Sequence, residues 1–161
     1  MSILIRPARH ADIPAIQALL AQVDRLHWAG QPDVFQPTPG PARDDVYLRS
    51  LISGWQTVVI LAEADSHLVG CLIARLQETP EVPMLVPQQY LMVDTLVVDA
   101  VHRSCGIGSE LMAHIEAWAQ DRDIHRVELN VFEFNTEARG FYEKQGYTTL
   151  SRRMAKHIKK G

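Results

Sequence analysis

The stretch Val101-His102-Arg103-Ser104-Cys105-Gly106-Ile107-Gly108-Ser109 decides the fold, because it joins two segments with different hydrophobic patterns. Before it, Tyr90–Val98 is almost continuously apolar, which favours a strand buried on both faces at the centre of a sheet. After it, apolar residues recur at the spacing of an amphipathic helix. These residues are Ile107, Leu111, Ile115 and Trp118.

The glycines of this stretch predict an anion-binding turn. Gly106 and Gly108 have no side-chain bulk, so successive N–H groups and the N-terminus of the helix can approach phosphate oxygens. Arg103 adds a charge-assisted contact. A diphosphate is the expected ligand.

Spacing weighs against two well-known phosphate-binding patterns. A nucleoside-triphosphate loop needs Gly-Lys-Ser/Thr, whereas Gly108 is followed by Ser109 and Glu110. A dinucleotide fingerprint needs a third Gly or Ala where this chain has Leu111, although Glu128 follows the turn at a suitable distance.

Alternating apolar residues after the helix predict a strand over Arg126–Val131. Because a helix separates it from Tyr90–Val98, the two strands are expected to lie parallel. Similar patterns predict the remaining elements. They are a strand at Ile3–Ile5, helices over 11–29 and 42–52, a hairpin of strands 57–63 and 68–77, a short helix over 135–144 and a final strand over 147–154.

Composition predicts one compact domain, residues 1–161. Hydrophobic residues make up 47% and charged residues 22% of the chain, as in ordinary globular proteins. The net charge of −3 provides no cationic field for nucleic acid. No apolar run approaches the ~20 residues of a membrane helix, and the N-terminus lacks a signal-peptide pattern, so no membrane partner and a cytoplasmic location are expected.

The cysteines and histidines point to no metal. Cys71 and Cys105 lie outside any CxxC motif and are expected to be reduced thiols. The seven histidines include no pair spaced three or four apart, so none shares a helix face as ligand pairs do.

Two motifs resemble signatures of the GNAT family of N-acetyltransferases. Arg103-Ser104-Cys105-Gly106-Ile107-Gly108, preceded by Leu96-Val97-Val98-Asp99, is similar to the acetyl-CoA signature Arg-x-x-Gly-x-Gly. Downstream, 135–147 is similar to a second signature with Asn, Phe-Tyr and Gly-Tyr at its key positions. Ala100 departs from the proline common in the family, which removes no chemical group.

The resemblance implies a mixed α/β fold. Its sheet is mostly antiparallel and twisted, one parallel pair of strands (Tyr90–Val98 and Arg126–Val131) splays apart, and helices cover both faces. Acetyl-CoA is the implied co-substrate. The backbone of Leu96, Val97 and Val98 would pair with the pantetheine amides. The pyrophosphate would be held by Arg103, Ser104, Cys105, Gly106, Ile107, Gly108 and Ser109, and Asn135 and Tyr142 would contact the cofactor arm and the thioester sulfur.

Two residues are candidates for moving protons. Asp94 occupies a position where the family often carries a Glu base, although an ordinary Asp is a weak base and needs burial or a water chain. The alternative for Asp94 is a hydrogen-bond acceptor within the strand, and Glu78, Glu81 and Glu133 are other base candidates. Tyr142 suits protonation of the leaving thiolate; its alternative is a core aromatic.

The expected function is direct transfer of an acetyl group from acetyl-CoA to a primary amine of a small molecule, peptide or protein. A non-catalytic acyl-CoA sensor or interaction module is the alternative. The family sets its acceptor through segments that are 26–35 and 79–90 here, which hold a partly aromatic, mildly acidic group of side chains, and many members form homodimers. The side chains in these two segments are His27, Trp28, Asp33, Phe35, Glu81 and Tyr90, and Glu78 lies next to the second segment.

Overall fold

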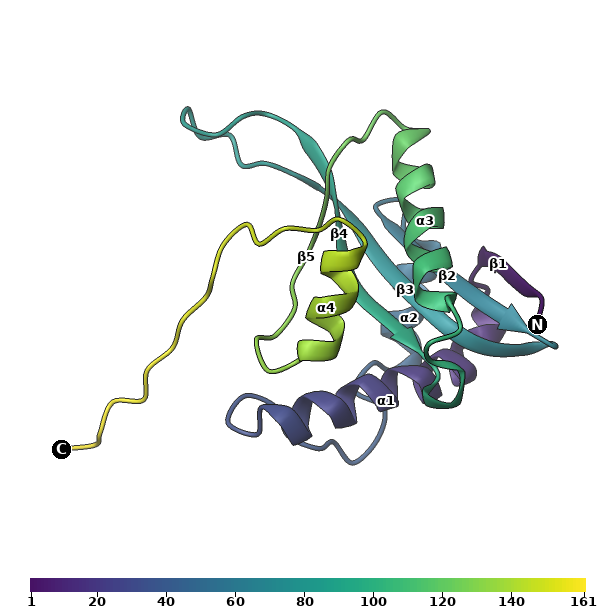
Figure 1. The fold of residues 1–161 in the computed structure, drawn as a ribbon, viewed down its shortest axis with the longest axis horizontal. Coiled ribbons are helices and arrows are strands. Elements are labelled where there is room, and N and C mark those ends of the chain that lie inside the picture. Colours follow the sequence, from purple (N-terminus) through teal and green to yellow (C-terminus); the bar gives the residue numbers. More distant parts are fainter. The chain divides into compact units, whose positions relative to one another are not determined.

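The computed structural model describes all of residues 1–161, which fall into two compact units, Met1–Asn130 and Val131–Gly161. The first unit contains the sheet and three α-helices, and the second contains one α-helix followed by an extended segment (Figure 1).

The sheet has five strands in the order β1-β2-β3-β4-β5, so each strand neighbours the next in sequence. The first four pair antiparallel, and β4 and β5 pair parallel. This confirms the predicted mixed α/β class and its single parallel pair. The strands are β1 Ile3–Pro7, β2 Thr57–Ala64, β3 His67–Glu78, β4 Gln89–Val98 and β5 Val127–Leu129.

A two-residue turn at Asp65 and Ser66 joins β2 to β3. Ala64 pairs with His67 across the turn, and both central residues have positive φ, 49° and 66°. Such turns match the twist of the strands they connect. The predicted hairpin is therefore confirmed.

The prediction that Tyr90–Val98 is the central strand is wrong. β3 is central, and it contains six consecutive buried residues from Val69 to Ala74. β4 lies one place from the edge, and the side chains along it are buried intermittently rather than continuously. Its apolar composition reflects helices that contact the strand from both faces of the sheet, and not a central position within the sheet.

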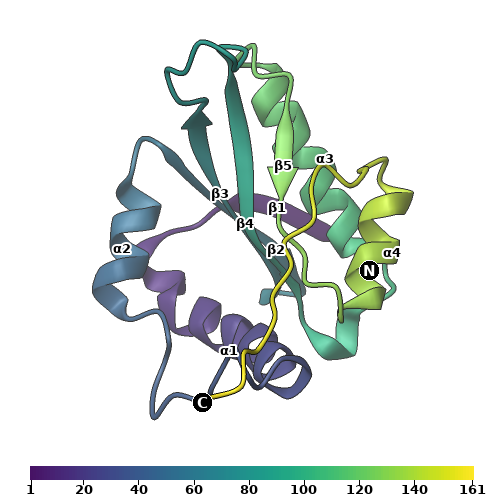
Figure 2. The ribbon, with the colours of Figure 1, turned by 90° about the vertical axis from the view of Figure 1, so that its left-hand side faces the viewer.

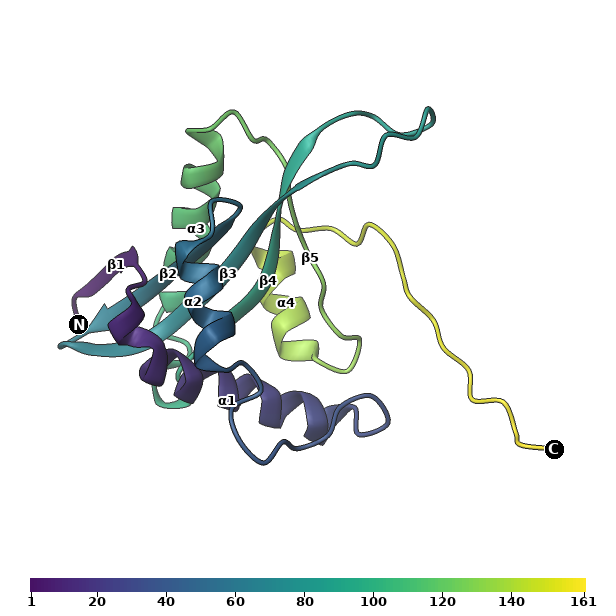
Figure 3. The same ribbon diagram turned by 180° about the vertical axis from the view of Figure 1, so that it is seen from behind.

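Helices cover both faces of the sheet (Figures 2 and 3). On one face, α1 (Ile13–Gly30) and α2 (Asp45–Ser53) bury apolar side chains against β2, β3 and β4. We call this the α1/α2 face. The core cluster there includes Ile16, Leu20, Leu48, Leu61, Cys71, Ile73 and Val97.

On the opposite face, α3 (Ile107–Gln120) packs closely against the sheet, and we call this the α3 face. The contact requires Gly70 on β3, because a Cβ at that position would lie 3.0 Å from Leu111 Cδ1 and 3.1 Å from Ile107 Cγ2. Leu111 and Ile107 are both almost completely buried. Burying such side chains contributes roughly 1.5–3 kcal/mol each and fixes the start of α3 against β3.

Most helix boundaries lie close to their predicted positions. α2 begins at Asp45, three residues later than expected, because the Asp44 side chain caps it by accepting a hydrogen bond from the Tyr47 N–H. α1 follows a short 3₁₀ turn at His10–Asp12 and has Pro14 in its first turn.

The second unit contains α4, Thr136–Lys144, and no strand. The predicted strand over 147–154 is therefore wrong: residues 148–161 are exposed and lack regular structure. Ser151, Arg152 and Arg153 interrupt the apolar residues, so no face of this segment carries the alternating pattern that a half-buried strand needs. No helix in the chain has both the length and the apolar character required to cross a membrane.

Candidate functional site

The parallel pairing of β4 with β5 is short. Only Leu91, Met92 and Val93 pair with β5, whereas β4 continues to Val98 and stays paired with β3. The Asp99 N–H donates to Val69 O on the β3 side at 2.8 Å. Because alternate residues of a strand direct their N–H groups to opposite sides, Leu96 and Val98 direct theirs to the side where β5 has ended.

This orientation divides the three residues predicted to pair with pantetheine. Leu96 and Val98 lie on the unpaired edge of β4, and the Val98 carbonyl there accepts a hydrogen bond from Arg103 Nε at 3.4 Å. Val97 instead directs its backbone toward β3, and its side chain is buried in the core of the α1/α2 face.

A β-bulge in β4 positions Asp94. Val93 pairs with Ala74 and Thr95 pairs with Ile73, so Asp94 is an extra residue that has no opposite residue in the backbone ladder with β3. The bulge brings Asp94 and Thr95 to line one cavity together, although adjacent strand residues normally point to opposite faces.

The predicted anion-binding turn has the backbone that its glycine pattern requires. Gly106 has φ +81° and ψ 1°, and Ser104 also has positive φ, 63°. Gly106 is the N-cap of α3 and contributes no capping side chain, so the first turn of the helix keeps N–H donors without intrahelical partners. A Cβ at Gly106 would meet no atom, so the glycine is required by backbone conformation and not by space inside the protein.

A side chain of α1 fixes the start of this loop. Gln22 Nε2 donates to Asp99 Oδ1 at 2.8 Å, and Gln22 Oε1 accepts from the Ala100 N–H at 3.0 Å. His102 Nδ1 lies 2.8 Å from the other Asp99 oxygen. The hydrogen bond from Gln22, followed by that of His102, lowers the pKa of the Asp99 carboxyl. Sequence reasoning missed Gln22 because it is 77 residues from Asp99.

The two cysteines are both free thiols in different surroundings. Cys105 is exposed in the loop, whereas Cys71 is completely buried in the α1/α2 core. Burial raises the pKa of the Cys71 thiol to about 12. Cys71 is therefore an inert core residue, as sulfur chemistry requires the thiolate.

Asp94 forms an ion pair with Arg75 on β3. Arg75 Nε lies 2.5 Å from Asp94 Oδ2, and Nη2 lies 3.0 Å from Oδ1. This hydrogen bond also raises the pKa of Arg75 above its ordinary value. The Asp94 side chain keeps 29% of its surface exposed, so it is accessible to an incoming amine.

A cavity of about 380 Å³ lies beside Asp94 on the α1/α2 face. None of its lining residues comes from the two segments expected to set the acceptor. Arg43 precedes α2 and Tyr47 lies on α2, and nothing in their local sequence distinguishes them from surface residues. The lining consists of Arg43, Tyr47, Leu51, Ile73, Arg75, Asp94 and Thr95.

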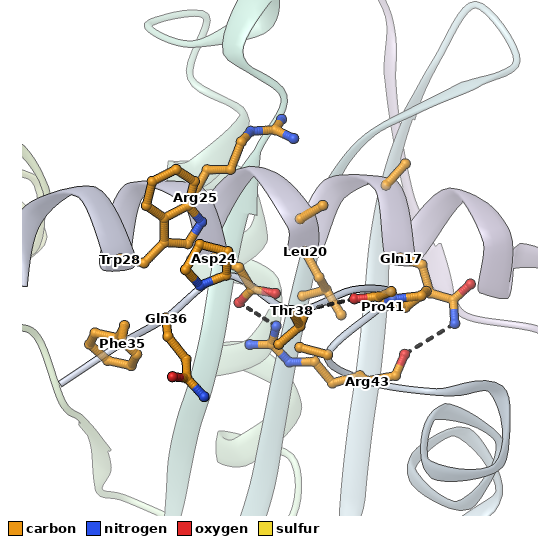
Figure 4. A pocket seen from close by; sticks show the side chains of 15 residues that line it. Gln17, Leu20, Asp24, Arg25, Trp28, Phe35, Gln36, Thr38, Pro41 and Arg43 are labelled. Carbon is orange, nitrogen blue, oxygen red and sulfur yellow. Dashed lines mark hydrogen bonds and ion pairs between the residues drawn. The ribbon is translucent and has the colours of Figure 1, made fainter. Parts of the chain in front are cut away.

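A second, larger cavity of about 670 Å³ lies between α1 and the proline-containing loop that follows it (Figure 4). Arg43 lines this cavity as well and pairs with Asp24 Oδ1 on α1 at 2.5 Å. Gln17 Nε2 donates to the Arg43 carbonyl at 3.0 Å. Arg43 is therefore shared by the two cavities and is held in place from α1.

Some of the expected acceptor residues do line the larger cavity. Trp28 and Phe35 belong to its wall, and Phe35 also stacks on His27 with ring centroids 5.0 Å apart. Burial lowers the pKa of His27. Asp33, Glu78, Glu81 and Tyr90 line neither cavity.

The other predicted site residues lie in the second unit. Asn135 caps α4, because its Oδ1 accepts a hydrogen bond from the Ala138 N–H at 3.1 Å. Tyr142 packs edge-on against Phe141 and Tyr147. Burial raises the pKa of Tyr142 to about 12, so the phenol stays protonated throughout the physiological range. Glu133 pairs at 3.5 and 3.6 Å with Arg139 and Arg152.

The features of the first unit fit the chemistry of an acyl-CoA. An unpaired strand edge suits the amides of pantetheine, and the positive-φ turn before α3 suits a diphosphate. No cluster of three or more His, Cys, Asp or Glu side chains is arranged to hold a metal ion.

Known proteins resemble this chain in sequence and in fold. Blasticidin-S acetyltransferase from Streptomyces morookaense is 40% identical over 62 residues, which are 38% of this chain and 45% of that protein. The chain thus matches less than half the length of this curated relative.

Two solved structures share the fold. A tetramutant of the BH1408 protein from Bacillus halodurans has a TM-score of 0.92 at 22% identity, covering 96% of this chain and 99% of that one. Aminoglycoside N-acetyltransferase AAC(6')-Iy in complex with CoA has a TM-score of 0.74 at 14% identity, covering 98% and 95%.

A family profile matches most of the chain. Residues 20–147 match the acetyltransferase (GNAT) family, and this range includes the turn before α3, Asp94 and both predicted signatures. The chain therefore belongs to the GNAT family of acetyltransferases.

Proposed function

We propose that the protein transfers the acetyl group of acetyl-CoA directly to a primary amine of a small molecule or peptide. The observation that carries this proposal is the combination of a β4 edge left without a partner beyond Val93 and the turn at Gly106 that begins α3. The membership in an acetyltransferase family supports the same reaction.

The proposal assigns most of the cofactor binding to residues of the first unit. Leu96 and Val98 pair their backbone groups with the pantetheine amides, and Val97 supports the strand from the core. Arg103, Ser104, Cys105, Gly106, Ile107, Gly108 and Ser109 hold the pyrophosphate, mostly through main-chain N–H groups. Acetyl-CoA supplies the thioester carbonyl that the amine attacks. Asn135 contacts the cofactor arm in addition to capping α4.

Two side chains accept and donate the protons of the reaction. The acceptor ammonium loses a proton to Asp94, directly or through water, which leaves a nitrogen lone pair to form the new N–C bond. The C–S bond breaks, and Tyr142 gives its proton to the departing sulfur. The raised pKa of Tyr142, about 12, supports this role because the phenol carries its proton at the working pH.

The test is thiol release from acetyl-CoA with a mixed panel of small amines and peptides. Initial velocities are expected to give intersecting patterns, as a ternary complex requires. Tyr142→Phe should lower kcat roughly 100-fold, in line with the loss of a general acid, and leave acetyl-CoA affinity within about threefold. Tyr147→Phe, which alters the neighbouring ring in the same unit, is the matched control and should keep kcat.

Two results would count against the proposal. Unchanged turnover in Tyr142→Phe would remove that residue from the mechanism. Calorimetric binding of acetyl-CoA without any acetylated product from the panel would favour a non-catalytic acyl-CoA sensor.

A further inference from the structure

The cavity beside Asp94 carries an unusual balance of charge for a site that must receive an amine. Two guanidinium groups, Arg43 and Arg75, line it against the single carboxylate of Asp94. Asp24, the partner of Arg43, belongs to the wall of the larger cavity. An acceptor that carries only positive charge would therefore meet two cations and one anion.

The Arg75–Asp94 pair is easy to open. Its side chains are 46% and 29% exposed, and exposed ion pairs contribute little to stability. The Asp94 carboxylate is held by two Arg75 donors, and a guanidinium has five N–H donors in all. A ligand bearing charges of both signs can replace this pair without leaving either group unpaired.

Neighbouring hydroxyls add donors around the same point. Tyr47 from α2 and Thr95 from β4 line the cavity with the charged groups. The Arg43 guanidinium pairs through Nη1 with Asp24 on α1, and Gln17 on α1 donates to the Arg43 main-chain carbonyl. The cavity thus presents several donors and one acceptor carboxylate, an arrangement suited to an anionic group close to an ammonium group.

We propose that the acceptor is a zwitterion of the α-amino acid class, an inference that rests on the acetyl transfer proposed above. The ammonium group of the acceptor replaces Arg75 at Asp94, and its carboxylate binds Arg75 and Arg43. In the transfer, the nitrogen loses a proton to Asp94 and forms the N–C bond as the C–S bond of acetyl-CoA breaks, and the leaving sulfur takes the proton of Tyr142. The carboxylate of the acceptor keeps its charge and fixes the orientation of the amine.

The test compares each L-amino acid with its own amide, which keeps the amine and the side chain and removes the negative charge. Thiol release is measured for both at matched concentrations. We expect kcat/KM to be at least about 10-fold higher for the acid, because its carboxylate gains charge-assisted contacts from two guanidinium groups that the amide lacks. The amine of an amide is less basic and so more often neutral, which biases the comparison against this outcome.

Substitutions in the cavity test whether its residues cause the preference for the acid over the amide. Arg75→Gln should lower kcat/KM for the acid at least about 10-fold while changing that for the amide less than about threefold. Arg43→Gln tests the same point through a residue outside the sheet. Arg49→Gln is the control, because Arg49 lies on α2, pairs with Asp45 and does not line the cavity. Circular dichroism and acetyl-CoA titration establish that each variant is folded.

Binding gives a second readout. Calorimetry of the acid and the amide with the CoA-saturated protein should show tighter binding of the acid, and Arg75→Gln and Arg43→Gln should each reduce the difference. If kcat/KM for the amides or for aminoglycosides equals or exceeds that for the acids, the proposal of a zwitterionic acceptor is wrong, while the proposal of acetyl transfer stands. Failure of every amine to release thiol would overturn acetyl transfer, and the zwitterion proposal with it.

Discussion

The two faces of the sheet use different parts of the chain. On the α3 face, Gly70 lets α3 pack closely on the sheet, and the turn at Gly106, where φ is positive, presents main-chain N–H groups at the start of the helix. On the α1/α2 face, two cavities are lined by side chains, with the ion pairs of Arg43 and Arg75 among them. A main-chain surface suits a ligand shared by a whole family, whereas a side-chain surface is free to differ from one protein to the next.

Thiol labelling should show the largest contrast between the faces. Cys105 in the exposed loop is expected to react with a maleimide at pH 8 at least 100-fold faster than Cys71, because burial raises the pKa of Cys71 to about 12 and excludes the reagent. Mass spectrometry after timed quenching measures both rates. Acetyl-CoA should slow labelling of Cys105, and an unchanged rate at saturation would contradict the placement of the phosphates there.

A substitution at Gly106 should separate the two faces functionally. Gly106→Val forces a β-branched residue to φ +81°, at a cost of about 2 kcal/mol or more, so acetyl-CoA affinity should fall about 30-fold. Gly40→Ala is the control, since a Cβ there meets no atom and φ is not positive. Calorimetry measures both. If Gly106→Val also lost the discrimination between acid and amide acceptors, the two faces would not bind their ligands independently.

The packing of α3 can be tested at a position that is not among the proposed ligand-binding residues. Gly70→Ala introduces a Cβ 3.0 Å from Leu111 Cδ1 and 3.3 Å from the Ala62 Cβ, which should destabilise the protein by about 1–2 kcal/mol. Chemical denaturation gives the difference in unfolding free energy. A neutral or stabilising result would mean that α3 can shift away from the sheet.

The smallest expected effect concerns the ion pairs near the N-terminus. Arg6 binds both oxygens of Asp12, at 2.8 and 2.9 Å, and this lowers the pKa of Asp12 from its ordinary 3.8. A carboxyl whose pKa is depressed by folding stabilises the protein above its unfolded pKa, and the contribution disappears as pH falls through the folded value. Asp12→Asn should therefore cost about 1 kcal/mol at pH 7, with the difference from wild type shrinking below pH 4 in thermal melts. A constant difference would assign the effect to packing.

The sequence predicts the α3 face better than the α1/α2 face, and the reason is physical. The turn at Gly106 and the helix after it depend on local backbone preferences, which adjacent residues reveal. The cavity beside Asp94 depends on Arg43, Tyr47 and Arg75, which come from separate elements and meet only through sheet register and helix packing. No local pattern marks them.

The two wrong predictions about the fold have related causes. Tyr90–Val98 was expected at the sheet centre because apolar content reports burial but not position within a sheet, and β3 takes that place. The strand expected over 147–154 rests on short apolar alternation, which the consecutive charges of Arg152 and Arg153 break. The roles of Asp94, Asn135 and Tyr142 remain predictions that the experiments above address.

The bulge in β4 adds one residue to the strand without disturbing the residues on either side of it. Val93 and Thr95 pair with the adjacent residues Ala74 and Ile73, so a β4 that lacked Asp94 would keep both pairs, and Val97 would stay in the core. An insertion or deletion elsewhere in β4 would instead move every later side chain to the opposite face. The carboxylate of Asp94 can therefore be gained or lost as a single inserted residue while the edge formed by Leu96 and Val98 stays as it is.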